Sequence, residues 1–361
     1  MKVPFVFLKR ESQHEWDIYC QAFETTARSG MYILGENVAS LEAALASYLG
    51  VEHVVTVNSG TDALILSMRA LDINAGDEVI TVGNSFIATA GAVIAVGAAP
   101  VLVDVLEDQL MDPARIEEKI TSRTKAVVPV HLTGRPADML SINAIAGKHG
   151  LFVIDDAAQS FGAVYRGKRY FDANATCYSF HPLKNYHCMG DGGAIATNNE
   201  TLYNKLLQLR NHGIDGKFSG CFGYNSRLDE VQASLLLKLM PGLDGKLRER
   251  RQRAARFIGA LGDLVLVPYW NESVMEPAFQ TFVIRTERRD ELAAFLNAQG
   301  IETRVHYPLP CHMQDAWRSQ ADVSLPVTEM QAHKILSLPI SHLLTEQEQD
   351  YIIHGIRRFF A

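Results

Sequence analysis

A lysine in an unusual setting is the residue best suited to covalent chemistry. Lys184 lies in the stretch YSFHPLKN, five residues after Ser179 and shortly before the glycine cluster GDGG at 190–193. Phe180 and Pro182 are close to Lys184 in sequence and could shield its amine from water. Such desolvation lowers the pKa of an amine and makes it nucleophilic. The pattern indicates a lysine that forms a Schiff base with a cofactor, although a solvated surface lysine is the ordinary alternative.

An acidic doublet is a second candidate for chemistry. Asp155 and Asp156 follow the apolar run LFVI, at the carboxyl end of an expected strand, where open α/β sheets bind ligands. A carboxylate there can keep a heterocyclic nitrogen protonated, which a pyridine ring needs in order to accept electrons. A carboxylate that caps the next turn explains the doublet equally well.

The phrase NSGTDAL indicates an anion site. It follows the apolar run HVVTV and opens a helical pattern, so the backbone amides of Gly60 and Thr61 point out of a helix N-terminus, where phosphate binds. Taken alone, the phrase is better explained as a plain turn with Ser59 or Thr61 as the helix cap.

Two sets of neighbouring histidine and cysteine residues could suggest a metal site, but we do not expect one. His187 with Cys188, and His306 with Cys311 and His312, lack the spacing of known ligand sets. The GDGG cluster lacks the G-x-G-x-x-G pattern and precedes a strand-like run, so we expect a tight turn there and no dinucleotide site.

Composition favours small-molecule chemistry. The 361 residues are 47% hydrophobic and carry a net charge of −7 with mixed signs, so no basic stripe predicts nucleic acid or an anionic membrane as partner. The longest apolar stretch, 90–103, is shorter than the ~20 residues of a bilayer span. Five scattered cysteines and a short N-terminal apolar run predict a cytoplasmic enzyme without disulfides or a signal peptide.

Alternation of strand and helix patterns predicts an α/β fold with a mostly parallel central sheet. Strands are expected at 53–57, 78–82, 100–105, 126–132 and 151–155, and helices at 61–71, 86–96, 112–120 and 138–150.

The pattern changes after Arg227. A long helical segment follows, which Pro241 and Gly242 interrupt. A strand at 280–286, a helix at 289–300, a strand at 302–307 and a closing helix to Phe360 then predict a small α+β domain. We expect a large domain at 1–240, including the N-terminal segment, and a small domain at 241–361.

Together, NSGTDAL, VIDDAAQSFGA, YSFHPLKN with GDGGA, GYNSRLDEVQA and VHYPLPCH resemble the motifs of the sugar aminotransferases of the DegT/StrS type, in the same order. These enzymes depend on pyridoxal 5′-phosphate (PLP), and the resemblance spans nearly the whole chain. It implies the fold-type I aminotransferase architecture, with helices around a mostly parallel seven-stranded sheet, a smaller C-terminal domain, and a homodimer with shared active sites.

The resemblance also implies roles for residues. Lys184 carries the cofactor, Asp156 pairs with the pyridine nitrogen, and Gln159 contacts the ring hydroxyl. Phe86 stacks on the ring. The phosphate contacts Gly60, Thr61 and Ser179, completed by the partner subunit's Asn225. For the substrate, the expected residues are Tyr32 of YILGENV, His306, Tyr307 and Arg227, of which Arg227 has a structural ion pair as an equal alternative.

The chain departs from the family pattern at two places but retains the lysine that bears on the reaction. Asp155 replaces the usual glutamate, and GDGG replaces GEGG. Related 3-dehydratases have histidine where this chain has Lys184, so the resemblance implies transamination, from L-glutamate to a keto group of a nucleotide-linked sugar.

The motifs specify less clearly which carbon of the sugar receives the amino group. GTDAL and HYPLP resemble members that aminate C3, whereas members acting at C4 read GTAAL. A C4 acceptor, a keto sugar without a nucleotide, and a non-catalytic PLP-binding regulator remain the alternatives.

Overall fold

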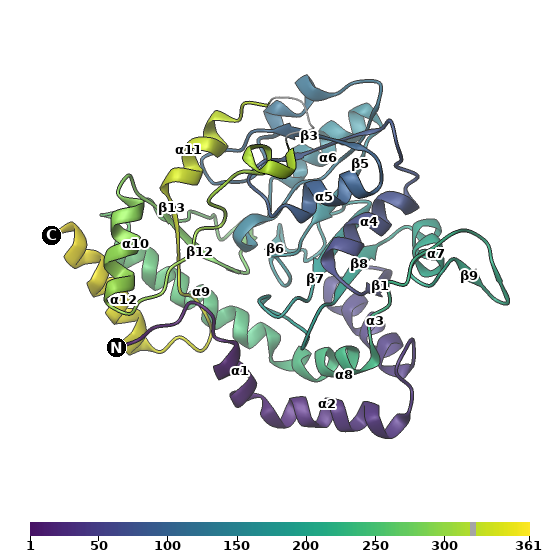
Figure 1. Cartoon of the computed structure of the whole chain (residues 1–361), viewed down its shortest axis with the longest axis horizontal. Helices are drawn as coiled ribbons and strands as arrows, with labels where there is room; N and C mark the ends of the chain where they lie inside the picture. Colours follow the sequence, from purple (N-terminus) through teal and green to yellow (C-terminus); the bar gives the residue numbers. More distant parts are fainter. Residues whose placement is uncertain (318–322) are drawn as a thin grey trace.

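A seven-stranded sheet forms the centre of the larger part of the chain (Figure 1). The computed structural model describes residues 1–317 and 323–361. Across the sheet the strands are β1 (His53–Val57), β8 (Gly193–Thr197), β7 (Ala175–Ser179), β5 (Phe152–Asp156), β4 (Thr124–Val127), β2 (Glu78–Val82) and β3 (Ala99–Val103). Strand β8 is antiparallel to both neighbours, and the remaining pairs are parallel. The expected mostly parallel α/β sheet is confirmed.

Helices cover both faces of this sheet, and strand alternation decides which residue meets which layer. Ile154 packs with α4 (Gly60–Ala70), α5 (Ala88–Ala95) and α7 (Glu200–Leu209). Val153 packs in the cluster that includes α3 (Glu36–Leu49), α6 (Met139–His149) and α8 (Glu230–Leu239). Successive side chains of a strand point to opposite faces, so the doublet that follows is also divided between the two layers.

The C-terminal part has a core of its own. Helix α9 (Leu243–Leu261) contributes Leu247 to the sheet cluster and Phe257 to the C-terminal cluster. A 3-10 turn at Met240–Gly242 separates α9 from α8, as the proline and glycine predicted. The other elements there are β11 (Met275–Glu276), β12 (Phe282–Arg285), α10 (Arg289–Ala298), α11 (Pro326–Lys334), β13 (Ile335–Leu338) and α12 (Glu346–Phe360).

The remaining elements are short or peripheral. They are α1 (Leu8–His14), α2 (Trp16–Ser29), β6 (Val164–Tyr165), β9 (Ile214–Asp215) and β10 (Phe218–Ser219), with 3-10 turns at Leu132–Gly134, Cys311–Met313 and Asp315–Trp317. In the described part of the chain, no helix is both long and apolar enough to cross a bilayer.

Two elements predicted from the sequence do not form. The helix at 112–120 is two 3-10 turns, Pro113–Arg115 and Glu117–Lys119, between which Ile116 is buried. One buried anchor cannot stabilise a longer helix by packing. The expected strand at 302–307 is reduced to a single bridge from Arg304 to Ser337 of β13, whose other edge pairs with β12.

The N-terminal segment packs with the C-terminal core. Val3 pairs with Ile301, and its N–H donates to Gly300 O at 2.8 Å. Val3 and Phe7 are buried in the C-terminal cluster, although we expected this segment in the large domain. The division into residues 1–240 and 241–361 stays a prediction.

A buried carboxylate joins the YILGENV loop to the start of α8. The carboxylate of Glu230 accepts hydrogen bonds from the backbone N–H groups of Gly35 (2.8 Å), Asn37 (3.0 Å) and Val38 (2.9 Å). The Asn37 side chain adds a bond of 2.8 Å. These amides form the first turn of α3, so Glu230 acts as the cap of a helix about 190 residues earlier in the chain.

We therefore expect Glu230→Gln to destabilise the protein by about 2 to 3 kcal/mol, because the new amide group points a donor at backbone donors. Chemical denaturation of both proteins measures this difference. Glu36→Gln is the matched control, since Glu36 lies in the same turn of α3 but is exposed. Equal destabilisation by the two substitutions would contradict the capping role.

Candidate active site

Two glycines bring the start of α4 against the sheet. A Cβ at Gly60 would lie 2.6 Å from the Cβ of Ser179, at the end of β7. A Cβ at Gly193 would lie 2.5 Å from the carbonyl oxygen of Ser59. Both distances are shorter than side chains tolerate, so NSGTDAL and GDGG are two sides of one close contact.

This contact leaves a place for an anion. Ser59 caps α4 by accepting a hydrogen bond from Asp62 N at 3.1 Å, and Thr61 in the first turn is exposed. The backbone amides of Gly60 and Thr61 therefore open beside Ser179, which accepts a bond from His181 N at 3.3 Å. A phosphate fits a helix N-terminus of this kind.

Asp156 faces this side of the sheet. Its Oδ2 accepts a hydrogen bond from Thr89 Oγ1 at 2.7 Å, and its Oδ1 accepts one from Ala158 N at 3.2 Å. The hydroxyl of Thr89 lies 2.7 Å from that of Ser85. Asp156 is buried, and these donors set the direction of its carboxylate as the partner of a ring N–H requires.

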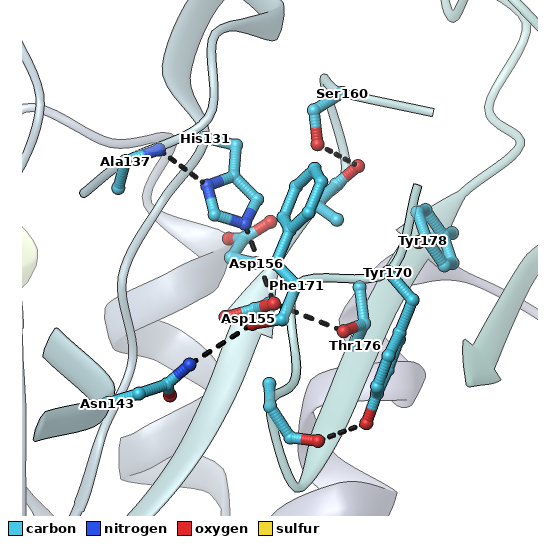
Figure 2. A network of polar contacts seen from close by, with 12 residues as sticks. His131, Ala137, Asn143, Asp155, Asp156, Ser160, Tyr170, Phe171, Thr176 and Tyr178 are labelled. Carbon is cyan, nitrogen blue, oxygen red and sulfur yellow. Dashed lines mark hydrogen bonds and ion pairs between the residues drawn. The ribbon is translucent and has the colours of Figure 1, made fainter. Parts of the chain in front are cut away.

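Asp155 precedes Asp156 in β5, so its side chain points to the opposite face of the sheet; Figure 2 shows its contacts with His131 and Thr176. Its side chain is completely buried, accepts a hydrogen bond from Thr176 Oγ1 at 3.1 Å, and lies 3.6 Å from His131 Nε2. His131 Nδ1 accepts from Ala137 N at 3.1 Å, so a neutral ring carries its proton on Nε2, towards Asp155. Asp155 therefore positions the loop of His131 and does not face the anion site.

Burial lowers the pKa of the Lys184 amine, and the nearby Asp156 carboxylate partly opposes this effect. The loop that carries Lys184 is anchored at its backbone: Lys184 N donates to His181 O at 2.8 Å. His187 Nδ1 lies 3.1 Å from Lys184 O, and His187 Nε2 lies 3.2 Å from Tyr19 OH. An amine with a lowered pKa is more often unprotonated near neutral pH, as a nucleophile or base must be.

Three predicted residues form one wall of the site. Gln159 Nε2 donates to Tyr307 OH at 3.4 Å, while its Oε1 accepts from Thr133 N at 2.9 Å. The Phe86 ring lies 5.8 Å from the Tyr307 ring at 41°. Phe86 is 55% exposed, so a face of its ring is open to a flat ligand.

His306 lies next to this wall. Its Nδ1 is 2.8 Å from Ser337 Oγ, and its ring stacks on Phe5 at 5.6 Å. Burial lowers the pKa of His306 to about 4, and the Lys184 and Arg304 side chains add to this effect when they are protonated. His306 is therefore neutral near pH 7.

Three predicted residues lie elsewhere. Asn225 is exposed and bridges Asn211, and Arg227 Nη1 donates to Asn211 Oδ1 at 3.0 Å. This contact is a hydrogen bond to a neutral amide and not the ion pair considered as the alternative for Arg227. Tyr32 is 58% exposed on the loop held by Glu230. The contacts of the described residues within one chain do not join these three to Lys184.

Sequence reasoning missed some residues of the site. Thr89 bonds Asp156, and its signal was a hydroxyl in the first turn of the helix that follows Phe86. His187 was considered only as a metal ligand. In the described residues, no group of three His, Cys, Asp or Glu side chains could hold a metal ion.

The arrangement meets the separate needs of one cofactor: an amine for its aldehyde, a carboxylate for its ring nitrogen, an aromatic wall for its ring and helix amides for its phosphate. On a mostly parallel sheet of this order, these features define a PLP-dependent aminotransferase of fold-type I. The chain belongs to the DegT/DnrJ/EryC1/StrS aminotransferase family, whose model matches residues 16–357. Enzymes of this family use PLP.

Comparisons with known proteins agree with the family. The chain is 41% identical to the dTDP-3-amino-3,4,6-trideoxy-alpha-D-glucose transaminase of Streptomyces venezuelae, over 99% of this chain and 96% of that one. It is 44% identical to the UDP-N-acetyl-3-dehydro-alpha-D-glucosamine 3-aminotransferase of Acidithiobacillus ferrooxidans, over 91% and 89%. The structure of NtdA from Bacillus subtilis with bound cofactor PMP has a TM-score of 0.94 and 35% identity, over 99% of this chain and 85% of that chain.

We expect Asp156→Asn to retain cofactor but lose turnover by about 100-fold or more, roughly 3 kcal/mol, because an amide does not keep the ring nitrogen protonated. Asp155→Asn is the matched control on the opposite face. It should cost about 1 to 3 kcal/mol of folding stability and leave turnover within about 10-fold. Steady-state kinetics and denaturation of both variants test this, and the reverse order of turnover would contradict the assignment.

Proposed function

We propose that this chain transfers the amino group of L-glutamate to the C3 keto group of a nucleotide-linked deoxysugar. The names of the two relatives above refer to sugars linked to different nucleotides, dTDP and UDP, yet both names place the amination at C3. Their shared position supports C3 over C4 for this chain, as do the phrases GTDAL and HYPLP.

The observation that carries the proposal is the position of Lys184, which is partly buried in the loop between β7 and β8, beside the first turn of α4 and near the Asp156 carboxylate. A regulator that only binds the cofactor needs an attachment point but no base. Transamination needs both, because the same amine must release the cofactor and then move a proton.

The residues divide the work. Bound PLP supplies an aldehyde for the incoming amine and a ring that takes up negative charge from the substrate carbon. Asp156 keeps the ring nitrogen protonated, and Phe86 covers one ring face. After the donor amine has displaced it from the cofactor, Lys184 Nζ would move the proton of the donor's α-carbon to the cofactor, and in the second half-reaction it would move a proton from the cofactor to C3 of the sugar. Gln159 and Tyr307 orient the ring edge.

The proposed enzyme is a homodimer with shared sites. The β9–β10 hairpin projects from the body of the chain (Figure 1). Large apolar side chains are exposed on α2, on this hairpin and directly after it: Trp16 (64%), Phe23 (64%), Phe218 (80%) and Phe222 (102%). Exposed aromatic residues in this number mark an association surface. Asn225 follows this hairpin, which supports a role at the phosphate of the other subunit.

We also place the enzyme in the cytoplasm. All five cysteines are free, two of them exposed, as expected in a reducing compartment.

Mixing Lys184→Ala subunits with Asn225→Ala subunits should restore part of the activity. A hybrid dimer has one site that carries both mutations and one site that carries neither, if Asn225 serves the other subunit's phosphate. Activity of purified, differently tagged hybrids measures the rescue. Full absence of rescue, or activity in a verified monomer, would exclude shared sites.

Incubation with L-glutamate and a panel of nucleotide-linked 3-keto and 4-keto sugars should give an amine at C3. Product regiochemistry is read by NMR. Amination at C4, or only of a sugar without a nucleotide, would refute this acceptor while leaving the aminotransferase activity intact. Absence of amination with any acceptor, together with no conversion of PLP by any amino acid, would refute the function.

A further inference from the structure

A cavity lies beside Lys184 at the junction of the N-terminal segment and the C-terminal core. Its volume is about 100 Å³, where roughly 10 to 15 Å³ suffices for one water molecule. The cavity therefore has room for several atoms of a ligand next to the reactive amine. Its lining includes Phe5, Lys184, Arg250, Thr281, His306 and Ser341.

Arg250 supplies a positive charge to this cavity. It lies in α9, and its Nη1 donates to the carbonyl oxygens of Phe279 (3.0 Å) and Ile340 (3.2 Å). These bonds fix the plane of the guanidinium. Among the described residues, Arg250 makes no other hydrogen bond, so its Nε and Nη2 groups remain available to a ligand. Burial lowers the pKa of Arg250 to about 10, which still leaves it charged near pH 7.

Two hydroxyl groups add donors to the same lining. Thr281 is 8% exposed, and its Oγ1 is buried without a hydrogen-bond partner among the described residues. Ser341 Oγ accepts a bond from Leu343 N at 3.1 Å, which leaves its O–H free to donate. A buried hydroxyl without a partner is costly unless a ligand or water completes it.

The other ionisable groups nearby leave the charge of Arg250 available. Glu11 also lines the cavity, but Lys246 Nζ lies 3.1 Å from Glu11 Oε1 and 2.6 Å from Glu15 Oε1. Burial lowers the pKa of His342, beside Glu11, to about 4, as it does for His306, so both rings are neutral near pH 7. Glu11 acts on the charge of Arg250, but no ion pair at contact distance joins Arg250 to a carboxylate of the described residues. The cavity thus combines this guanidinium with free hydroxyl donors.

We propose that this cavity is the subsite for a carboxylate of the amino donor, with Arg250 and Thr281 as its ligands. The proposal rests on the proposed function, because the α-carbon of the donor must reach Lys184 Nζ and its carboxylates lie within a few bonds of that carbon. A guanidinium with two free N–H directions suits a carboxylate better than a neutral sugar hydroxyl.

The test is the first half-reaction, in which L-glutamate converts bound PLP to its amino form, followed by the absorbance of the cofactor. Thr281→Val should raise the half-saturating L-glutamate concentration about 5-fold to 10-fold, and Arg250→Lys about 10-fold or more. Thr303→Val is the control: Thr303 is a buried threonine of the same core, and its hydroxyl accepts from Asn297 Nδ2 at 3.4 Å instead. It should change the value less than about 2-fold.

Binding of glutarate, a dicarboxylate that cannot react, gives a readout independent of turnover. Calorimetry should show weaker glutarate binding in Thr281→Val and Arg250→Lys than in the wild type and in Thr303→Val. Two other donors show which carboxylate is bound. L-Glutamine keeps only the α-carboxylate of glutamate, and 4-aminobutyrate keeps only the distal one. The donor whose half-saturating concentration still rises in the variants carries the bound carboxylate.

Unchanged half-saturation and unchanged glutarate binding in folded Thr281→Val and Arg250→Lys would overturn the subsite. If Arg250→Lys does not fold, Thr281→Val decides alone. If none of the amino donors converts PLP in the wild type, the proposed function is refuted instead. Glutarate binding would still decide whether the cavity holds carboxylates.

Discussion

The start of α4 can touch the sheet only because residues 60 and 193 have no side chain. Any Cβ there would lie within 2.6 Å of Ser179 or Ser59. This contact sets the amides of α4 beside the end of β7, and the Lys184 loop runs from that end of β7 to the start of β8. The candidate anion site and the Lys184 loop therefore depend on the same contact, and a displaced α4 would change both.

Strand β5 shows how one element serves chemistry and folding at once. Its last two side chains are both aspartates, but pleating sends Asp156 to the layer of α5, where Thr89 orients it. Asp155 goes to the layer of α6, where it meets Thr176 and His131. A one-residue shift of β5 would exchange these roles, so the parallel pairing of β5 with β4 and β7 fixes the site as well as the core.

The C-terminal part completes the site from another direction. It supplies Tyr307 to the wall formed with Gln159 and Phe86, and His306, Arg250 and Thr281 to the cavity beside Lys184. Because the N-terminal segment packs on that same core, Phe5 stacks on His306 and contributes to the lining of the cavity. Residues from both ends of the chain thus control what approaches the amine.

The sequence by itself determined the α/β class, the mostly parallel sheet and the family, because strand periodicity, turn residues and motif order are local properties. It also indicated Lys184, Asp156 and the start of α4. Only the tertiary structure decided what depends on distant segments meeting: Thr89 with Asp156, Glu230 with the first turn of α3, β13 as the partner of β12, and the packing of residues 3 and 7 on the C-terminal core. These contacts join residues up to about 300 positions apart, and neither local propensity nor spacing carries information about such pairings.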